Sequence, residues 1–201
     1  MVGGIELEIR PVRPGEHERA GALVVAAYRA LPGAHLSSGY AELLADVARR
    51  AEDAVVLVAV GRDVGAGALA GCVTYVPDRS SPFAEELSDG EAGVRMLAVD
   101  PASQGRGIGR ALVEACIARA RAEGRSALVL HTTPWMEAAH AVYSRLGFSR
   151  APSRDLTPLP EVPLLAFTLA LDEGTGTRQA TGGGGIAFGA PGWRNWQARG
   201  A

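Results

Sequence analysis

One stretch, residues 94–120, constrains the fold of this chain more than any other. Residues 94–99 are apolar apart from Arg95 and end at a turn signal, Asp100-Pro101. Glycine then occupies every second position from Gly105 to Gly109. Apolar residues recur at helical spacing from Ile108 to position 120, and Gly124 ends the pattern. The stretch predicts a strand, a tight glycine loop and a helix.

The predicted loop is suited to binding an anion. Glycines carry no Cβ atom, so a ligand can approach the backbone closely. The first N–H groups of a helix have no partner within it, and with the helix dipole they attract negative charge. Arg106 and Arg110 can add charge-assisted hydrogen bonds. The sequence therefore predicts a ligand that carries a phosphate or a diphosphate.

Two common phosphate-binding motifs do not fit this loop. The Walker motif requires a lysine, and this chain has none. The dinucleotide fingerprint requires Gly or Ala at its sixth position, where the two possible registers place Arg110 and Leu112. The pattern that remains is Q-x-x-G-x-G, from Gln104 to Gly109.

This pattern resembles the [RQ]-x-x-G-x-[GA] acetyl-coenzyme A loop of the GNAT superfamily of N-acetyltransferases, and residues 96–101 resemble the strand before it. The resemblance covers about residues 5–171. It implies an α/β (α+β) fold: a mixed sheet of about seven strands, splayed between the fourth and fifth, with about four helices. It also implies the residues that contact acetyl-coenzyme A: Leu97, Ala98, Val99, Gln104, Gly105, Arg106, Gly107, Ile108, Gly109 and Arg110.

The hydrophobic periodicity along the chain agrees with this order of elements. The expected strands are 5–10, 54–60, 68–76, 94–99, 127–130, one beginning at 148, and 164–171. The expected helices are 16–29, 40–51, one from 108, and 136–146. The segments 31–39, 61–67 and 78–90 are expected to be loops, the last of them mobile, and prolines interrupt residues 153–163.

Length and composition suggest one domain, residues 1–171, followed by a tail, residues 172–201. The tail holds nine of the 26 glycines and shows no periodicity, so we expect it to be disordered. We also expect that deleting it from residue 174 leaves activity and Tm unchanged.

The net charge of −2 favours neither nucleic acid nor a membrane as a partner. Without a leader or a long apolar run, we expect a cytoplasmic protein. Cys72 and Cys116 lie in apolar segments, which favours buried free thiols.

The resemblance also names catalytic candidates. Residues 139–148 resemble the family signature A-x-x-L-Y-x-x-L-G-F, which implies that the Tyr143 hydroxyl lies beside the coenzyme sulfur as a general acid. Glu91 is the candidate base, although the commoner position of a carboxylate falls at Gly93. His131 and His140 are each a structural histidine or a proton relay. The histidine spacing predicts no metal site.

Three functional interpretations stay open at this point. The first is acetyl transfer from acetyl-coenzyme A to an amine of a small molecule or peptide, by direct attack. The second is a non-catalytic acyl-coenzyme A sensor or partner module of the same fold, and the third is O-acyl transfer. The segments expected to form the acceptor pocket, 28–40, 75–92 and 150–163, contain no diagnostic motif. A homodimer is compatible with the resemblance.

Overall fold

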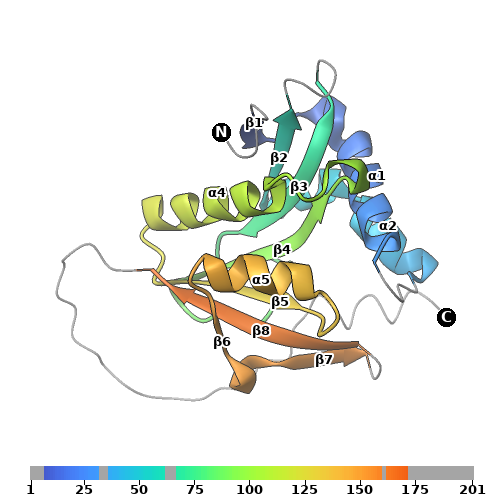
Figure 1. The fold of residues 1–201 in the computed structure, drawn as a ribbon. Helices are drawn as coiled ribbons and strands as arrows, with labels where there is room; N and C mark the ends of the chain where they lie inside the picture. The colour runs from blue at the N-terminus through green and yellow to red at the C-terminus, as the bar shows by residue number, and fades with distance from the viewer. Residues whose placement is uncertain (1–6, 32–35, 62–66, 160–161, 172–201) are drawn as a thin grey trace.

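A computed structural model of the chain describes residues 7–31, 36–61, 67–159 and 162–171 (Figure 1). The strands are β1 (Leu7–Pro11), β2 (Val55–Gly61), β3 (Leu69–Val76), β4 (Glu91–Val99), β5 (Ala127–Thr132), β6 (Ser149–Arg150), β7 (Leu156–Leu159) and β8 (Val162–Ala170). The α-helices are α1 (His17–Arg29), α2 (Ser38–Ala45), α3 (Val47–Asp53), α4 (Ile108–Ala122) and α5 (Glu137–Arg145). None of the helices in these ranges has the length and hydrophobicity of a membrane span.

The strands form one mixed sheet in the order β1-β2-β3-β4-β5-β8-β6, with β7 added to β8. The pair β4–β5 is parallel, and the other pairs are antiparallel. Alternate residues of the central strands bury opposite faces. Leu57 and Val73 pack beneath α4 and α5, whereas Val58 and Cys72 pack against α1 and α2. The mixed α/β architecture expected from the sequence is therefore confirmed.

The sheet opens between β4 and β5. The two strands pair from Glu91↔Ala127 to Val94↔Leu130, and beyond this point β4 keeps β3 as its only strand partner among the described residues. One extra residue on β4 shifts its register against β3, because Cys72 pairs with Ala98 but Thr74 pairs with Arg95. Met96, inside this bulge, has a positive φ of 52°. The expected splay therefore coincides with a strained backbone position.

Three expected elements differ from the structure. The expected helix 40–51 is two helices, because Asp46 leaves the helical conformation (ψ 69°) and its side chain accepts the Arg49 N–H to begin α3. The proline-rich segment 153–163 contains a strand, β7, that we did not expect. Its Pro158 lies on an edge strand, where a missing N–H is tolerated. Glu91 is the first residue of β4 rather than a residue before it.

Gly71 on β3 allows α4 to lie against the sheet. A Cβ atom there would lie 2.9 Å from both Ile108 Cγ2 and Leu112 Cδ1, and 3.0 Å from the Ala98 carbonyl oxygen. We therefore expect Gly71→Ala to lower the free energy of unfolding by about 1–3 kcal/mol through overpacking. Chemical denaturation would measure this loss. Gly15→Ala is the control, because a Cβ there has no neighbour within 4 Å; equal stability of the two variants would contradict the prediction.

Candidate active site

The glycine loop leaves the sheet from a fixed point, Asp100. Its N–H donates to the Ala70 carbonyl at 3.0 Å, and its carboxylate accepts from the Ala102 N–H at 3.4 Å and the Ser103 hydroxyl at 3.1 Å. Ser103 is buried. These bonds connect the end of β4 to the first turn of the loop, so the position of the loop follows that of the sheet.

The beginning of α4 presents unpaired N–H groups. Gly105 and Gly107 have positive φ values of 75° and 78°, a conformation that favours glycine. Gly107 is the N-cap and offers no side chain, and the first helical bond runs from the Ala111 N–H to the Gly107 carbonyl. The N–H groups of residues 108–110 therefore lack an acceptor within the helix. By contrast, the side chains of Ser37 and Asp46 cap α2 and α3.

The polar side chains predicted for this loop lie on its surface. Gln104 and Arg106 are exposed, and Arg110 forms an exposed ion pair with Glu114 at 2.9 Å. Such an exposed pair contributes little, so a phosphate can replace Glu114 at small cost. A Cβ on Gly105 would have no neighbour within 4 Å, so the loop backbone is open to a ligand. The loop residues therefore fit a diphosphate.

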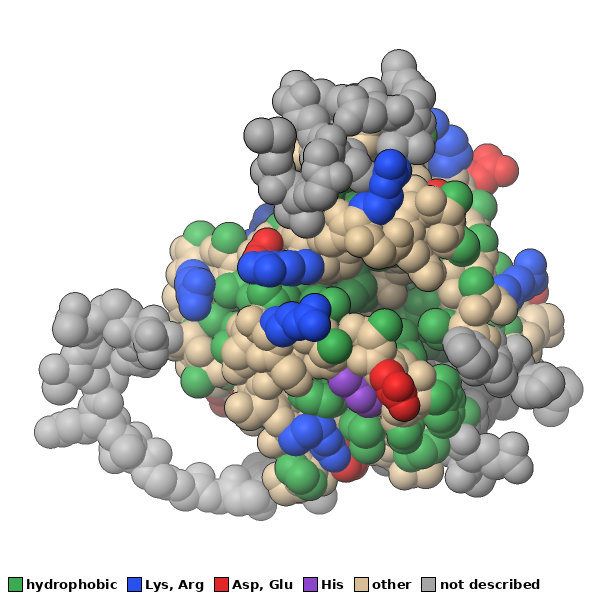
Figure 2. All heavy atoms as spheres, viewed as in Figure 1, with side chains coloured by type: hydrophobic (Ala, Val, Ile, Leu, Met, Phe, Trp, Pro, Cys, Tyr) green, Lys and Arg blue, Asp and Glu red, His purple; other side chains and the backbone are tan. Residues whose placement is uncertain are grey.

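A groove follows the free edge of β4. The part of β4 that has no partner on its β5 side, among the described residues, includes Leu97, Ala98 and Val99, and Leu97 and Val99 pack toward α4. Figure 2 shows this face hollowed between α4 and α5, with hydrophobic side chains inside the hollow and arginine side chains on its left-hand rim. An unpaired strand edge can bind an extended chain through its backbone groups. The site therefore suits an extended ligand whose anionic end lies at the start of α4.

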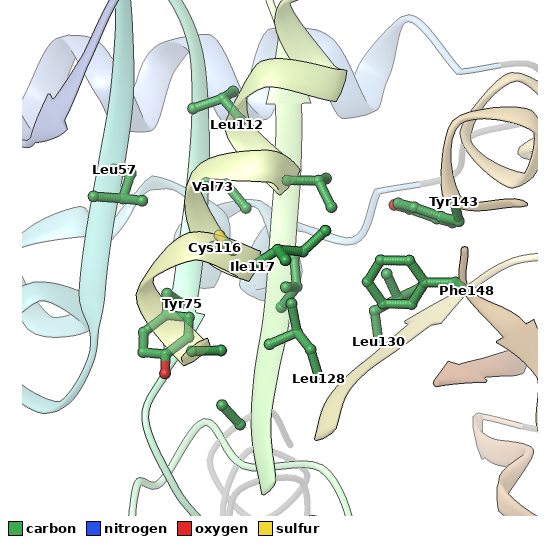
Figure 3. Close-up of a cluster of buried hydrophobic side chains, with 14 of the residues drawn as sticks. Leu57, Val73, Tyr75, Leu112, Cys116, Ile117, Leu128, Leu130, Tyr143 and Phe148 are labelled. Carbon is green, nitrogen blue, oxygen red and sulfur yellow. The ribbon is translucent and has the colours of Figure 1, made fainter. Parts of the chain in front are cut away.

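Tyr143 on α5 is held beside the opening of the sheet. It is 4% exposed, and its ring packs against Phe148 and Phe167 with centroid distances of 5.9 and 6.0 Å. In Figure 3 its hydroxyl points from α5 toward β4. Burial raises the pKa of Tyr143 above its ordinary value, with a smaller contribution from Cys116, so the hydroxyl stays protonated. Among the described residues, none forms a hydrogen bond with this hydroxyl, so it is available to an acceptor.

Glu91 is engaged in a partly buried ion pair. Arg154 donates to both of its carboxylate oxygens, at 2.8 and 2.7 Å, and the Ser88 N–H donates at 2.8 Å. Burial alone raises the pKa of this carboxyl, but the hydrogen bonds from Arg154 and Ser88 outweigh it and the pKa is lowered. A carboxylate with a lowered pKa and both oxygens bonded is a weak proton acceptor. This geometry argues for a structural role of Glu91.

We expect Glu91→Gln to lower the free energy of unfolding by about 1–3 kcal/mol, because Arg154 loses its charged partner. The pKa of Glu91 is lower in the folded state than in the unfolded state. Its contribution is therefore present above the unfolded-state pKa and is lost as the pH falls through the folded-state pKa. Thermal unfolding from about pH 7 to about pH 3 should show the Tm difference between wild type and variant shrinking. A difference independent of pH would contradict this.

The two histidine candidates differ in their surroundings. His140 lies 3.0 Å from the Thr133 carbonyl through Nε2 and packs on Phe167, which is a structural role. The side chain of His131 is 3% exposed and lies beside Glu85. A Cβ on Gly93 would lie 3.4 Å from side-chain atoms of Leu87 and Val76, which is ordinary van der Waals contact.

Sequence analysis assigned no catalytic or coenzyme-binding role to three charged residues around this opening: Glu85, Arg95 and Arg154. Arg95 carries the only charge among residues 94–99, which is the one local signal that marked its position. Its guanidinium bonds the Glu85 carboxylate and the Phe83 carbonyl. The contact of Arg154 with Glu91 joins residues 63 positions apart, and no local pattern predicts such a pair.

Comparison with known proteins agrees with this geometry. Residues 22–148 match the model of the acetyltransferase (GNAT) family. Comparison with curated proteins gives no significant match. A GNAT-family acetyltransferase from Brucella melitensis, solved with acetyl-CoA, is 26% identical, with a TM-score of 0.55 over 87% of this chain and 97% of its own.

Two further structures share the fold. YncA from Salmonella typhimurium, solved with its cofactor acetyl-CoA, is 20% identical over 87% of this chain and 99% of its own, with a TM-score of 0.62. A GNAT-family acetyltransferase from Staphylococcus aureus Mu50 is 14% identical over 83% of this chain and 100% of its own, with a TM-score of 0.66. The family model covers well over half of the sequence, and this chain belongs to the acetyltransferase (GNAT) family.

Proposed function

We propose that this protein transfers an acetyl group from acetyl-coenzyme A to the amine of a small molecule or peptide. The observation that supports it best is one juxtaposition. An uncapped helix N-terminus follows the end of β4, β4 has no partner on its β5 side beyond Val94 among the described residues, and the Tyr143 hydroxyl points toward β4 (Figure 3). An anion site alone would serve many ligands, and a free strand edge alone would serve any extended chain. Together they suit a ligand with a diphosphate, an extended arm and a reactive end.

The residues proposed to hold the coenzyme divide into two groups. The N–H groups of residues 108–110, with Gln104, Arg106 and Arg110, bind the diphosphate. The backbone of Leu97, Ala98 and Val99 pairs with the pantetheine arm as an added strand would. Acetyl-coenzyme A supplies the acetyl group as a thioester, whose carbonyl carbon the amine attacks.

Two groups of the chain act on the charge that develops. A backbone N–H of the free β4 edge donates to the carbonyl oxygen as it becomes negative. Tyr143 donates its hydroxyl hydrogen bond to the sulfur as the C–S bond breaks. An ordinary tyrosine pKa of about 10 against a thiol pKa of about 8.5 makes full proton transfer uphill by roughly 2 kcal/mol. Burial raises the pKa of Tyr143 further, so hydrogen bonding contributes more than complete transfer.

Release of free thiol from acetyl-coenzyme A in the presence of a panel of amines tests the proposal. We expect release that depends on the amine, together with the acetylated amine by mass spectrometry. Acetyl-coenzyme A binding without turnover for any amine would favour the non-catalytic module, and products only from alcohols would indicate O-acyl transfer. Glu91→Gln should retain turnover within about threefold, whereas a base would lose about 10²-fold or more.

A further inference from the structure

Arg50 on α3 is a buried cation whose hydrogen-bonding capacity is only partly used. Its side chain is 0% exposed. Nη1 donates to the carbonyl oxygens of Leu43 and Leu44, at 2.7 and 2.9 Å, in the last turn of α2. Nε and Nη2 are buried, and neither has a hydrogen-bond partner among the described residues. A buried charge without a partner is costly, and burial accordingly lowers the pKa of Arg50.

The two free donors indicate the shape of the missing partner. Nε and Nη2 lie along one edge of the planar guanidinium, and their N–H groups can donate two parallel hydrogen bonds to the two oxygens of a carboxylate. A water molecule offers one oxygen and no charge, so it matches this edge less well. Asp46, a carboxylate within electrostatic reach of Arg50, instead accepts the Arg49 N–H. The free edge therefore fits a carboxylate that the described part of the chain does not supply.

Tyr28 on α1 and Tyr40 on α2 add two hydroxyl groups to this region. Their rings meet edge to face with a centroid distance of 6.3 Å, and both side chains are within electrostatic reach of Arg50. Burial raises the pKa of both hydroxyls, so they stay protonated and can donate. Neither hydroxyl is hydrogen-bonded within the ranges that the structure describes. Glu85, a carboxylate within reach of Tyr40, already pairs with Arg95.

The same two tyrosines connect Arg50 with the opening between β4 and β5. Tyr28 is within electrostatic reach of Tyr143, and both Tyr28 and Tyr40 are within reach of Arg95 on β4. The two tyrosine side chains are partly exposed, whereas Arg50 is buried. A small molecule that lies along these tyrosines has one end near the opening and the other near the guanidinium.

We infer that the acceptor is an amino acid whose carboxylate binds the Nε–Nη2 edge of Arg50 and the hydroxyls of Tyr28 and Tyr40. The inference rests on the proposed function and names its substrate class. The carboxylate enters beside the partly exposed tyrosines and is held away from water, where a charge-assisted pair is strong. The amine nitrogen forms the bond to the acetyl carbon as the C–S bond breaks. Of the two protons that the ammonium nitrogen loses, one ends on the coenzyme thiol and the other in water.

Matched pairs of amines test the inference. Straight-chain ω-amino acids of graded length are compared with their carboxamides, which have nearly the same shape but no negative charge. At the length that spans the site, we expect kcat/KM for the amino acid to exceed that for its carboxamide by about 10²–10³-fold, because the carboxamide leaves the buried guanidinium without an anion. Alkyl chains of other lengths should show a smaller ratio.

Three variants locate the selectivity. Arg50→Lys should lower the ratio of amino acid to carboxamide at least about tenfold, because lysine keeps the charge and can donate to the α2 carbonyls but lacks a two-pronged edge. Tyr40→Phe keeps the ring and removes one donor, so it should lower the ratio about fivefold. Arg49→Lys is the matched control, because Arg49 is the exposed neighbour of Arg50 on the same helix; it should keep the wild-type ratio.

The ratio separates substrate recognition from stability. If Arg50 only supports the fold, Arg50→Lys lowers turnover of amino acid and carboxamide by the same factor, and this result overturns the inference. Equal kcat/KM for each amino acid and its carboxamide in the wild type also overturns it, and leaves the proposed function intact. If Arg50→Lys does not fold, Tyr40→Phe alone decides between these results. A wild type that acetylates no amine overturns the proposed function, and this inference with it.

Discussion

Tyr143→Phe should lower kcat by about 10²–10⁴-fold while leaving the affinity for acetyl-coenzyme A unchanged within about threefold. The substitution keeps the ring that packs on Phe148 and Phe167 and removes only the hydroxyl that points toward β4. The departing thiolate then lacks its hydrogen-bond donor in a site shielded from water, where an unpaired charge is costly. Steady-state thiol release would measure kcat, and calorimetry would measure affinity.

Tyr75→Phe is the matched control for this variant. Tyr75 lies in the same buried cluster, but its hydroxyl donates to Glu123 at 2.7 Å. Its removal should lower stability by about 1.5–3 kcal/mol, since the bond is to a charged group, and leave kcat unchanged. An unchanged kcat for Tyr143→Phe would remove this hydroxyl from the mechanism. A loss of equal size in both variants would show that the effect is one of packing.

Gly107→Val should weaken acetyl-coenzyme A binding by about 10²–10⁴-fold. Gly107 has a φ of 78°, where a β-branched residue is strained by roughly 1–3 kcal/mol, and its side chain would stand beside the N–H groups that begin α4. Loss of two hydrogen bonds to a charged group, at about 1.5–3 kcal/mol each, corresponds to that range of Kd. Calorimetric titration of the folded variant would measure it.

The opposite end of the same helix provides the control. Gly124 also has a positive φ, 67°, and follows the last turn of α4. Gly124→Val should therefore cost comparable stability without changing the Kd for acetyl-coenzyme A. If both variants lose affinity equally, the effect comes from unfolding of α4 rather than from the loop. If neither loses affinity, the loop does not bind the coenzyme.

The features that sequence predicted well are local ones. The helix from Ile108 and its end at Gly124 are confirmed, because a 3.6-residue period and a left-handed glycine can be read from neighbouring residues. The burial of both cysteines is confirmed, and burial raises the pKa of Cys116 to about 12. Apart from β7, the strands were located within a few residues for the same reason. The break between α2 and α3 at Asp46 was not predicted, because the apolar pattern continues through it and only the capping aspartate marks the start of α3.

The missed features of the site are set by contacts distant in sequence. The bulge at Met96 has no glycine to mark it, although its φ is 52°. Glu85 contacts His131 on β5, which lies 46 positions later in the sequence, and Glu91 contacts Arg154, which lies 63 positions later. Only the folded sheet brings these groups together. The glycine loop before α4 was therefore predictable from the sequence, whereas the charged contacts of Glu85, Glu91 and Arg154 were not.

The central claim is that the start of α4 binds the diphosphate of the coenzyme and thereby directs the thioester toward Tyr143. Calorimetric titration of the intact protein with acetyl-coenzyme A and with S-acetylpantetheine, which lacks the diphosphate, tests it most directly. The claim predicts saturable heat at one site per chain with acetyl-coenzyme A and none with S-acetylpantetheine at the same concentrations. Equal binding of the two compounds, or no heat with acetyl-coenzyme A, would contradict it.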